Sequence, residues 1–186
     1  TTRSVKLEGL AGDDTLQGGG GDDRLDGGDG NDVLNGGGGE DELFGGDGDD
    51  TITASGLGVF NDDSDQTAVY DGAGNDEVVG VPNGGGMGID IIVGSGNDIF
   101  RASGDALGNE RLRFEDYTYE GPRQQDVIVR FDTETSGTIE NDGFGGEDKF
   151  FGFSRVTGSD RNDTFVGSDG RQRLEGNDGD DTIYGM

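Results

Sequence analysis

The sequence predicts an all-β solenoid, in which short strands coil around a narrow core. Five nine-residue units follow one another without a break over residues 9–53, reading GLAGDDTLQ, GGGGDDRLD, GGDGNDVLN, GGGGEDELF and GGDGDDTIT. Glycine fills most of positions one, two and four, an acid stands at position six, and one aliphatic residue stands at position eight. A fixed short period of this kind indicates a repeat architecture, in which each unit stacks on its neighbours.

Positions seven to nine of each unit are expected to form a very short strand whose middle side chain points inward. The inward residues are then Leu16, Leu25, Leu34, Leu43 and Ile52. The six residues before each strand form a turn, because glycine adopts positive φ angles at no steric cost. Two units complete one coil of eighteen residues, with a strand on each side.

Beyond the first block the period becomes irregular. Residues 54–70 interrupt it and are expected to form a solvated loop. Looser repeats follow at 71–79, 85–93 and 94–101, with Asp76, Asp90 and Asp98 at the acidic position. The period resumes over 158–184, where Gln172 replaces one acid.

Residues 102–157 contain only degenerate repeats and most of the aromatic residues. We expect them to continue the solenoid around a larger aromatic core, with strands at 111–114, 125–131 and 149–153. The chain is thus divided into a block at 1–101 with an insertion at 54–70, a segment at 102–157, and a block at 158–186. It begins and ends inside repeats, so we expect a fragment of a larger protein.

The composition restricts the possible partners and chemistry. The chain has 41 acidic and 13 basic residues, and its net charge of −28 disfavours nucleic acid and anionic membranes but favours cations. The absence of cysteine and histidine excludes disulfides and argues against zinc and copper sites and a Ser-His-Asp triad. No apolar run reaches the ~18 residues of a membrane span. No motif indicates an active site, so we expect this segment not to be an enzyme.

The repeats do not bury enough apolar surface to fold alone. Burial of one leucine contributes about 1.5–3 kcal/mol, whereas ordering the backbone of nine residues costs about 9–18 kcal/mol. The acids of residues 9–53 also repel one another. A bound cation would offset both costs. Calcium is the best candidate, since it accepts six to eight carboxylate and carbonyl oxygens in flexible geometry, whereas magnesium demands a strict octahedron.

The repeats resemble the repeats-in-toxin (RTX) family, whose signature is GGxGxDxUx with a large aliphatic residue at U. The resemblance covers about half of the chain and implies a right-handed parallel β-roll with calcium between turns one coil apart. In that family one turn supplies the carbonyls of positions two and four and its aspartate. The turn one coil later supplies the carbonyls of positions one and three and its own aspartate.

The resemblance therefore implies at least four calcium ions in shared sites. Their ligands would be Leu10, Gly12 and Asp14 with Gly27, Asp29 and Asp32; Gly19, Gly21 and Asp23 with Gly36, Gly38 and Asp41; Gly28, Gly30 and Asp32 with Gly45, Asp47 and Asp50; and Ser159, Arg161 and Asp163 with Gly176, Asp178 and Asp181. Asp76, Asp90 and Asp98 are expected to bind calcium without an assigned pairing. The turn of Gln172 is expected to bind weakly or not at all.

The resemblance further implies a bacterial protein that is exported unfolded by type I secretion and folds on calcium outside the cell. The segment would then support the secretion and stability of a larger chain. One alternative is a polysaccharide-binding module of a secreted carbohydrate-active enzyme, using Arg111, Arg113, Arg123 and Arg130 with Tyr117 and Tyr119. Against it, the aromatic residues can fill the core and the arginines can pair with Glu115, Asp116 and Glu120. Another alternative is the non-catalytic part of an RTX protease, lipase or toxin.

Overall fold

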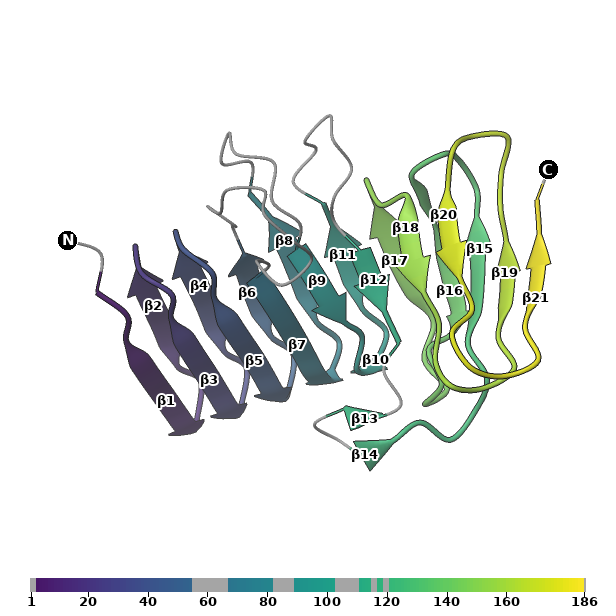
Figure 1. Cartoon of the computed structure of the whole chain (residues 1–186). Coiled ribbons are helices and arrows are strands. Elements are labelled where there is room, and N and C mark those ends of the chain that lie inside the picture. The colour runs from purple at the N-terminus through teal and green to yellow at the C-terminus, as the bar shows by residue number, and fades with distance from the viewer. Residues whose placement is uncertain are drawn as a thin grey trace.

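Two long sheets face each other along the whole chain and are joined by turns at both edges (Figure 1). The structure is a computed structural model that describes residues 3–54, 67–81, 89–102, 111–114, 117–118 and 121–185. Every regular element in these residues is a strand. The chain is a parallel β-solenoid, as the repeats predict.

The first sheet begins with the first strand of the chain and contains one strand from each later coil. Its order is β1 (Lys6–Ala11), β3 (Arg24–Asp29), β5 (Glu42–Asp47), β7 (Thr67–Gly74), β9 (Ile89–Ile92), β12 (Arg111–Arg113), β18 (Arg155–Thr157) and β20 (Arg173–Glu175), with β10 (Ser95–Gly96) also paired to β7. All of its pairs are parallel.

The second sheet faces the first and carries the alternate strands. Its order is β2 (Thr15–Gly19), β4 (Val33–Gly37), β6 (Thr51–Ala54), β8 (Glu77–Gly80), β11 (Ile99–Arg101), β17 (Asp148–Phe151), β16 (Ser136–Asn141), β15 (Ile128–Phe131), β19 (Thr164–Val166) and β21 (Thr182–Tyr184). A separate small antiparallel pair joins β13 (Tyr117–Thr118) to β14 (Gly121–Pro122).

The core consists of the position-eight side chains stacked in straight columns. Leu16, Leu34 and Ile52 pair in register along the second sheet, and Leu25 and Leu43 along the first. All five are buried, as predicted. In the first block the strands are longer than three residues, because the ladder continues through the glycines at positions one and two of the next unit. In the C-terminal block β19, β20 and β21 have the expected three residues.

Aromatic side chains contribute to the core in and beside the central segment. Within 102–157 Phe114 and Phe150 are fully buried, and the rings of Phe131 and Phe150 meet edge to face at 4.9 Å; Phe100 and Phe165, on either side of this segment, are also fully buried. The parallel prediction is wrong at one place, because β16 runs antiparallel to both β15 and β17. Two consecutive hairpins thus replace coils in the second sheet, while β12 pairs directly with β18 in the first.

The insertions lengthen single coils and leave the stack intact. Leu43 pairs with Val69, which lies 26 residues further along, and Asp76 follows Asp50 at the same interval. Of the expected loop at 54–70, Ala54 lies in β6 and residues 67–70 lie in β7. The remainder of that loop, 55–66, is outside the described residues.

Candidate metal centre

The position-six aspartates form two rows, one along each edge where the chain passes between the sheets. The first row follows strands of the first sheet and contains Asp14, Asp32, Asp50, Asp76 and Asp98. The second row follows strands of the second sheet and contains Asp23 and Asp41. Each carboxylate lies at the end of a glycine-rich turn, directly before the next strand.

One oxygen of each aspartate holds the neighbouring coil. In the first row, Oδ1 accepts the backbone N–H of the preceding aspartate, at distances of 2.7–2.9 Å from Asp14 through to Asp148. In the second row Asp23 accepts from Val5 and Asp41 accepts from Asp23, and Asp41 then donates to Thr67 Oγ1 at 3.3 Å. These bonds fix the orientation of the carboxylates that accept them, from Asp32 to Asp148 in the first row and at Asp23 and Asp41 in the second.

In eight buried aspartates, one carboxylate oxygen is buried and accepts no hydrogen bond from the described part of the chain. This holds for Oδ2 of Asp23, Asp32, Asp41, Asp50, Asp71, Asp76, Asp142 and Asp148. A buried carboxylate oxygen without a partner is energetically costly, and buried charges are normally paired or bind metals. A row of such oxygens fits a row of cations.

The unpartnered oxygen converges with a backbone carbonyl of the next coil. A Cβ atom added to Gly9 would lie 2.7 Å from Asp14 Oδ2 and 2.5 Å from the Gly27 oxygen. The same convergence, at a position-one glycine, recurs for Asp23 with Gly36, Asp32 with Gly45, Asp50 with Asp71, and Asp163 with Gly176. Four of these five pairs belong to the four ligand sets expected from the sequence.

The other expected carbonyls lie in the same turns, and most of them also contact the adjacent coil. Those at positions two and four stack against glycines of the next coil: Leu10 against Gly28, Gly12 against Gly30, Gly19 against Gly37, Gly21 against Gly39, Gly28 against Gly46, and Gly30 against Gly48. These receiving glycines have positive φ angles between 96° and 131°, and a side chain there would strike the carbonyl. At position three, the Asp29 and Asp47 oxygens accept the N–H groups of Gly12 and Gly30 at 2.7 Å, while Gly38 donates to Gly19.

Burial makes these carboxylates hard to ionise without a cation. It raises the pKa of Asp41 and of Asp50 to about 6, and neighbouring acids add to the effect. The same cause raises the pKa of Asp76 to about 8 and that of Asp148 to about 9. A bound calcium ion would supply the positive charge that lets these groups remain ionised at neutral pH.

The C-terminal turn differs from the N-terminal ones. Asp163 accepts the Ser159 N–H at 2.7 Å and the Ser159 hydroxyl at 2.9 Å, so Ser159 satisfies oxygens that are unpartnered elsewhere. The Arg161 carbonyl lies against Gly179, and Asp181 Oδ1 accepts the Asp163 N–H, while Asp178 is exposed. Gln172 binds Ser168 through both ends of its amide and needs no cation.

The structure corrects the phase of the middle repeats. Ser95 pairs with Ala73 and Gly96 with Gly74, so Val93 stands at position one and Asp98 at position six of a full nine-residue unit. Asp90 then falls at position seven, inside β9, and its carboxylate forms ion pairs with Arg111 at 2.8 Å and Arg113 at 3.0 Å. Asp90, expected as a calcium ligand, therefore has its charge compensated by two guanidinium groups instead.

The arginines expected to bind polysaccharide are engaged elsewhere. Arg123 is fully buried, and its guanidinium donates to the carbonyls of Asp142 and Val93 between the rings of Phe114 and Phe144. Arg111 and Arg113 pair with Asp90, and the exposed Arg130 pairs with Glu140. The expected partners Glu115 and Asp116, and Glu120, are outside the described residues.

Sequence reasoning missed the position-five side chains, which form further rows along both edges of the solenoid. They accept the N–H of position five in the next coil: Asp13 from Asn31, Asp22 from Glu40, Asn31 from Asp49, Asp49 from Asn75, and Asn75 from Asn97. These side chains are exposed and close the outer rim of each turn. The sequence did contain a signal for these contacts, because these units carry Asp, Asn or Glu at position five.

The sequence reasoning also missed three buried acids, Asp71, Asp142 and Asp148.

The comparison with protein families agrees with this geometry. The family of RTX calcium-binding nonapeptide repeats (4 copies) matches residues 6–34, 26–56 and 157–186. These ranges cover the turns of both ends of the solenoid. RTX repeats are generally non-catalytic structural modules and typically occur in secreted proteins. No curated protein and no solved structure gave a match. The described residues contain no helix long and apolar enough to cross a bilayer.

Proposed function

We propose that this chain, whose ends carry RTX calcium-binding nonapeptide repeats in a β-solenoid, folds on binding calcium and supports a larger secreted protein. The calcium ions would lie in the turns, each shared by two coils. The ligands would be the position-six aspartates with the carbonyls of positions one to four assigned above, Asp90 excepted. At least four ions are expected, and Asp76 and Asp98 extend the first row.

The observation that carries this proposal is the set of eight buried Oδ2 atoms without a hydrogen-bond partner in the described residues. In each N-terminal turn Oδ1 is already used to hold the adjacent coil, so only Oδ2 remains for a ligand. The turn brings that oxygen to a backbone carbonyl of the next coil. Anionic and neutral oxygens in this combination are the ligands that calcium prefers.

Calcium binding would then be the driving force for folding. The ions would be bound only where two coils are stacked, so binding free energy adds directly to the stability of the folded state. Calcium supplies positive charge to rows of carboxylates that otherwise repel one another in a buried setting. A chain that depends on external calcium in this way would stay unfolded during export from a calcium-poor cytosol.

Circular dichroism of the whole chain tests the proposal. With a chelator present the spectrum should be that of a largely disordered chain, and millimolar calcium should produce β structure. Calorimetric titration should find four or more ions per chain. A β spectrum that is unchanged by chelator and calcium would contradict the proposal, and magnesium at the same concentration serves as the control for ionic strength.

The position of this segment in a parent protein follows the same reasoning. We place residues 1–101, 102–157 and 158–186 in one solenoid, because both sheets run through all three segments. The parent would be a bacterial RTX protein exported by type I secretion, with any catalysis outside this chain. A polysaccharide-binding role gains no support from the described arginines, since Arg111 and Arg113 pair with Asp90 and Arg123 is buried.

A further inference from the structure

Asp71 stands where the preceding coils of the first row have glycine. Strand pairing aligns Tyr70 with Phe44 and Gly72 with Gly46, so Asp71 occupies the position of Gly9, Gly27 and Gly45. In those coils the space beside the glycine Cα is where the aspartate Oδ2 and the next carbonyl converge. A side chain at this position therefore enters the candidate ion site itself.

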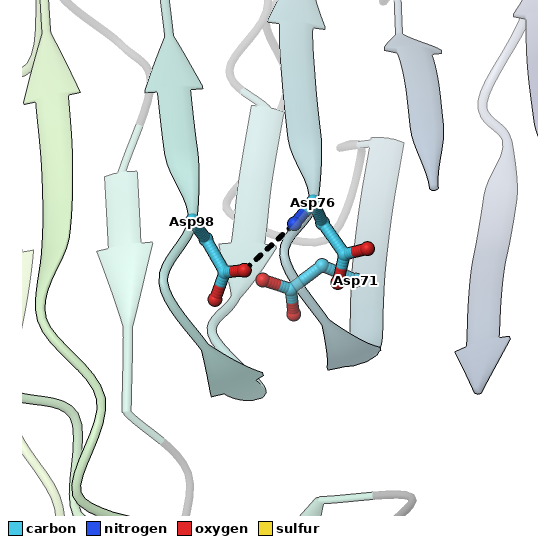
Figure 2. Close-up of side chains that lie close together, drawn as sticks. All are labelled: Asp71, Asp76 and Asp98. Atoms are coloured by element: carbon cyan, nitrogen blue, oxygen red, sulfur yellow. Dashed lines mark hydrogen bonds between the residues drawn. The ribbon is translucent and has the colours of Figure 1, made fainter. Parts of the chain in front are cut away.

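Three buried carboxylates meet at this point (Figure 2). Oxygen atoms of Asp71, Asp76 and Asp98 all lie within 4.8 Å of one another, and the Asp71 carboxylate lies between the other two in the view. The residues are at most 2% exposed. Asp76 and Asp98 come from adjacent coils of the first row, so Asp71 adds a third carboxylate to a site that has two in the neighbouring turns.

A purely structural role does not account for an acid at position 71. Asp71 Oδ1 accepts the N–H of Gly94 at 2.6 Å and that of Gly72 at 3.1 Å. An asparagine oxygen could also accept both bonds. The acid adds Oδ2, which is fully buried and has no hydrogen-bond partner in the described chain, as is also true of Asp76 Oδ2. Two such oxygens in one cluster indicate a cation between them.

We propose that Asp71, Asp76 and Asp98 form a three-carboxylate calcium site that binds more tightly than the two-carboxylate turns and releases its ion last. This inference rests on the proposed calcium-dependent function and adds an order to the sites. The affinity of oxygen sites for calcium increases with the number of charged ligands. The site is central in the first row, with Asp50 on one side and Asp148 on the other. Its ion would hold the middle of the solenoid together while the outer coils exchange theirs.

Release kinetics test this order. The calcium-loaded full chain is mixed with an excess of a fluorescent chelator, and the released calcium is followed with time. The wild-type chain should show a slowest phase of about one ion per chain. In Asp71→Asn that phase should merge with the faster ones, with at least about a tenfold increase in its rate. Asp71→Gly, which restores the residue of the other coils, should behave in the same way.

Asp49→Asn is the matched control. Asp49 is exposed at position five of the neighbouring turn and accepts the Asn75 N–H at 2.9 Å, and asparagine already serves at the equivalent Asn31. It removes the same charge from the same edge and should leave the slow phase unchanged. If both Asp71 variants fold in saturating calcium and keep the slow phase, the three-carboxylate site is wrong. If the wild-type chain releases no calcium, the proposed function itself fails.

Discussion

Asp32 should contribute more to calcium-dependent stability than Asp14, because it lies between two coils of the first row. Its Oδ1 accepts the Asp14 N–H at 2.8 Å, and its own N–H donates to Asp50 at 2.7 Å. In the proposed arrangement it is a ligand of the ion shared with Asp14 and of the ion shared with Asp50. Asp14 is the first member of the row and belongs to one ion. Asparagine at position 32 keeps the oxygen that accepts the Asp14 N–H. At either position it replaces one carboxylate oxygen by an amide nitrogen.

The expected difference follows from the number of ions each residue binds. Weakening one site tenfold costs about 1.4 kcal/mol. Asp14→Asn should therefore lower the free energy of unfolding in excess calcium by about 1.4 kcal/mol, and Asp32→Asn by about 3 kcal/mol. The buried position of Asp32, which is 1% exposed, makes its loss at least this severe.

Urea unfolding in excess calcium measures both changes, and calorimetric titration counts the ions that each variant retains. Asp13→Asn is the control, because Asp13 is an exposed position-five residue and the equivalent Asn31 already makes the same type of bond. Its stability should match the wild type. Equal losses for Asp32→Asn and Asp14→Asn, or a full complement of ions in Asp32→Asn, would refute the sharing of ions along the row.

Two further predictions concern protons and glycine. Burial raises the pKa of Asp41 and Asp50 to about 6 and that of Asp76 to about 8, so the folded chain binds protons that the unfolded chain releases. The metal-free chain should therefore gain β circular dichroism on acidification towards about pH 4, and lose it as the pH rises through about 6 to 8; a signal that falls on acidification would contradict this. Gly27→Ala should cost about 1–3 kcal/mol and lower calcium affinity, because the added Cβ would strike Asp32 Oδ2 and the Gly45 carbonyl. Calcium titration and urea unfolding measure this, and unchanged values for both would show that the space is not used by an ion.

Much of the fold could be predicted from the sequence because its period is a local property. Leu25 and Leu34 repeat every nine residues, and this spacing alone places them inward on opposite sheets. The pairing of turns one coil apart follows from the same period. Asp14 Oδ2 and the Gly27 oxygen come from two such turns, and both lie beside the position of a Cβ atom at Gly9. No long-range information is needed where the coil has constant length.

The remainder could not be predicted because it depends on contacts across insertions. The insertion before β9 lengthens its coil to 22 residues, and the repeat there begins at Val93, one residue earlier than the glycine pattern indicates. Asp90 consequently falls in a strand, and Val93 replaces glycine at position one. The antiparallel β16 depends on its pairing with β15 and β17. Asp71 stands in an ordinary-looking repeat, and its meeting with Asp98 depends on a coil of 22 residues.

The hydrogen bonds between successive aspartates make the first row a one-dimensional cooperative chain. Ordering one carboxylate fixes the backbone N–H of the coil before it, so each coil acts on its nearest neighbours, as in a stack of repeats with Ising-like coupling. The chain of bonds runs to Asp148 and is then interrupted by the hairpins, because Asp163 instead accepts the Val127 N–H. The number of coils between Asp14 and Asp148 should therefore set how steeply folding depends on calcium concentration. The C-terminal coils should form a second, shorter cooperative unit.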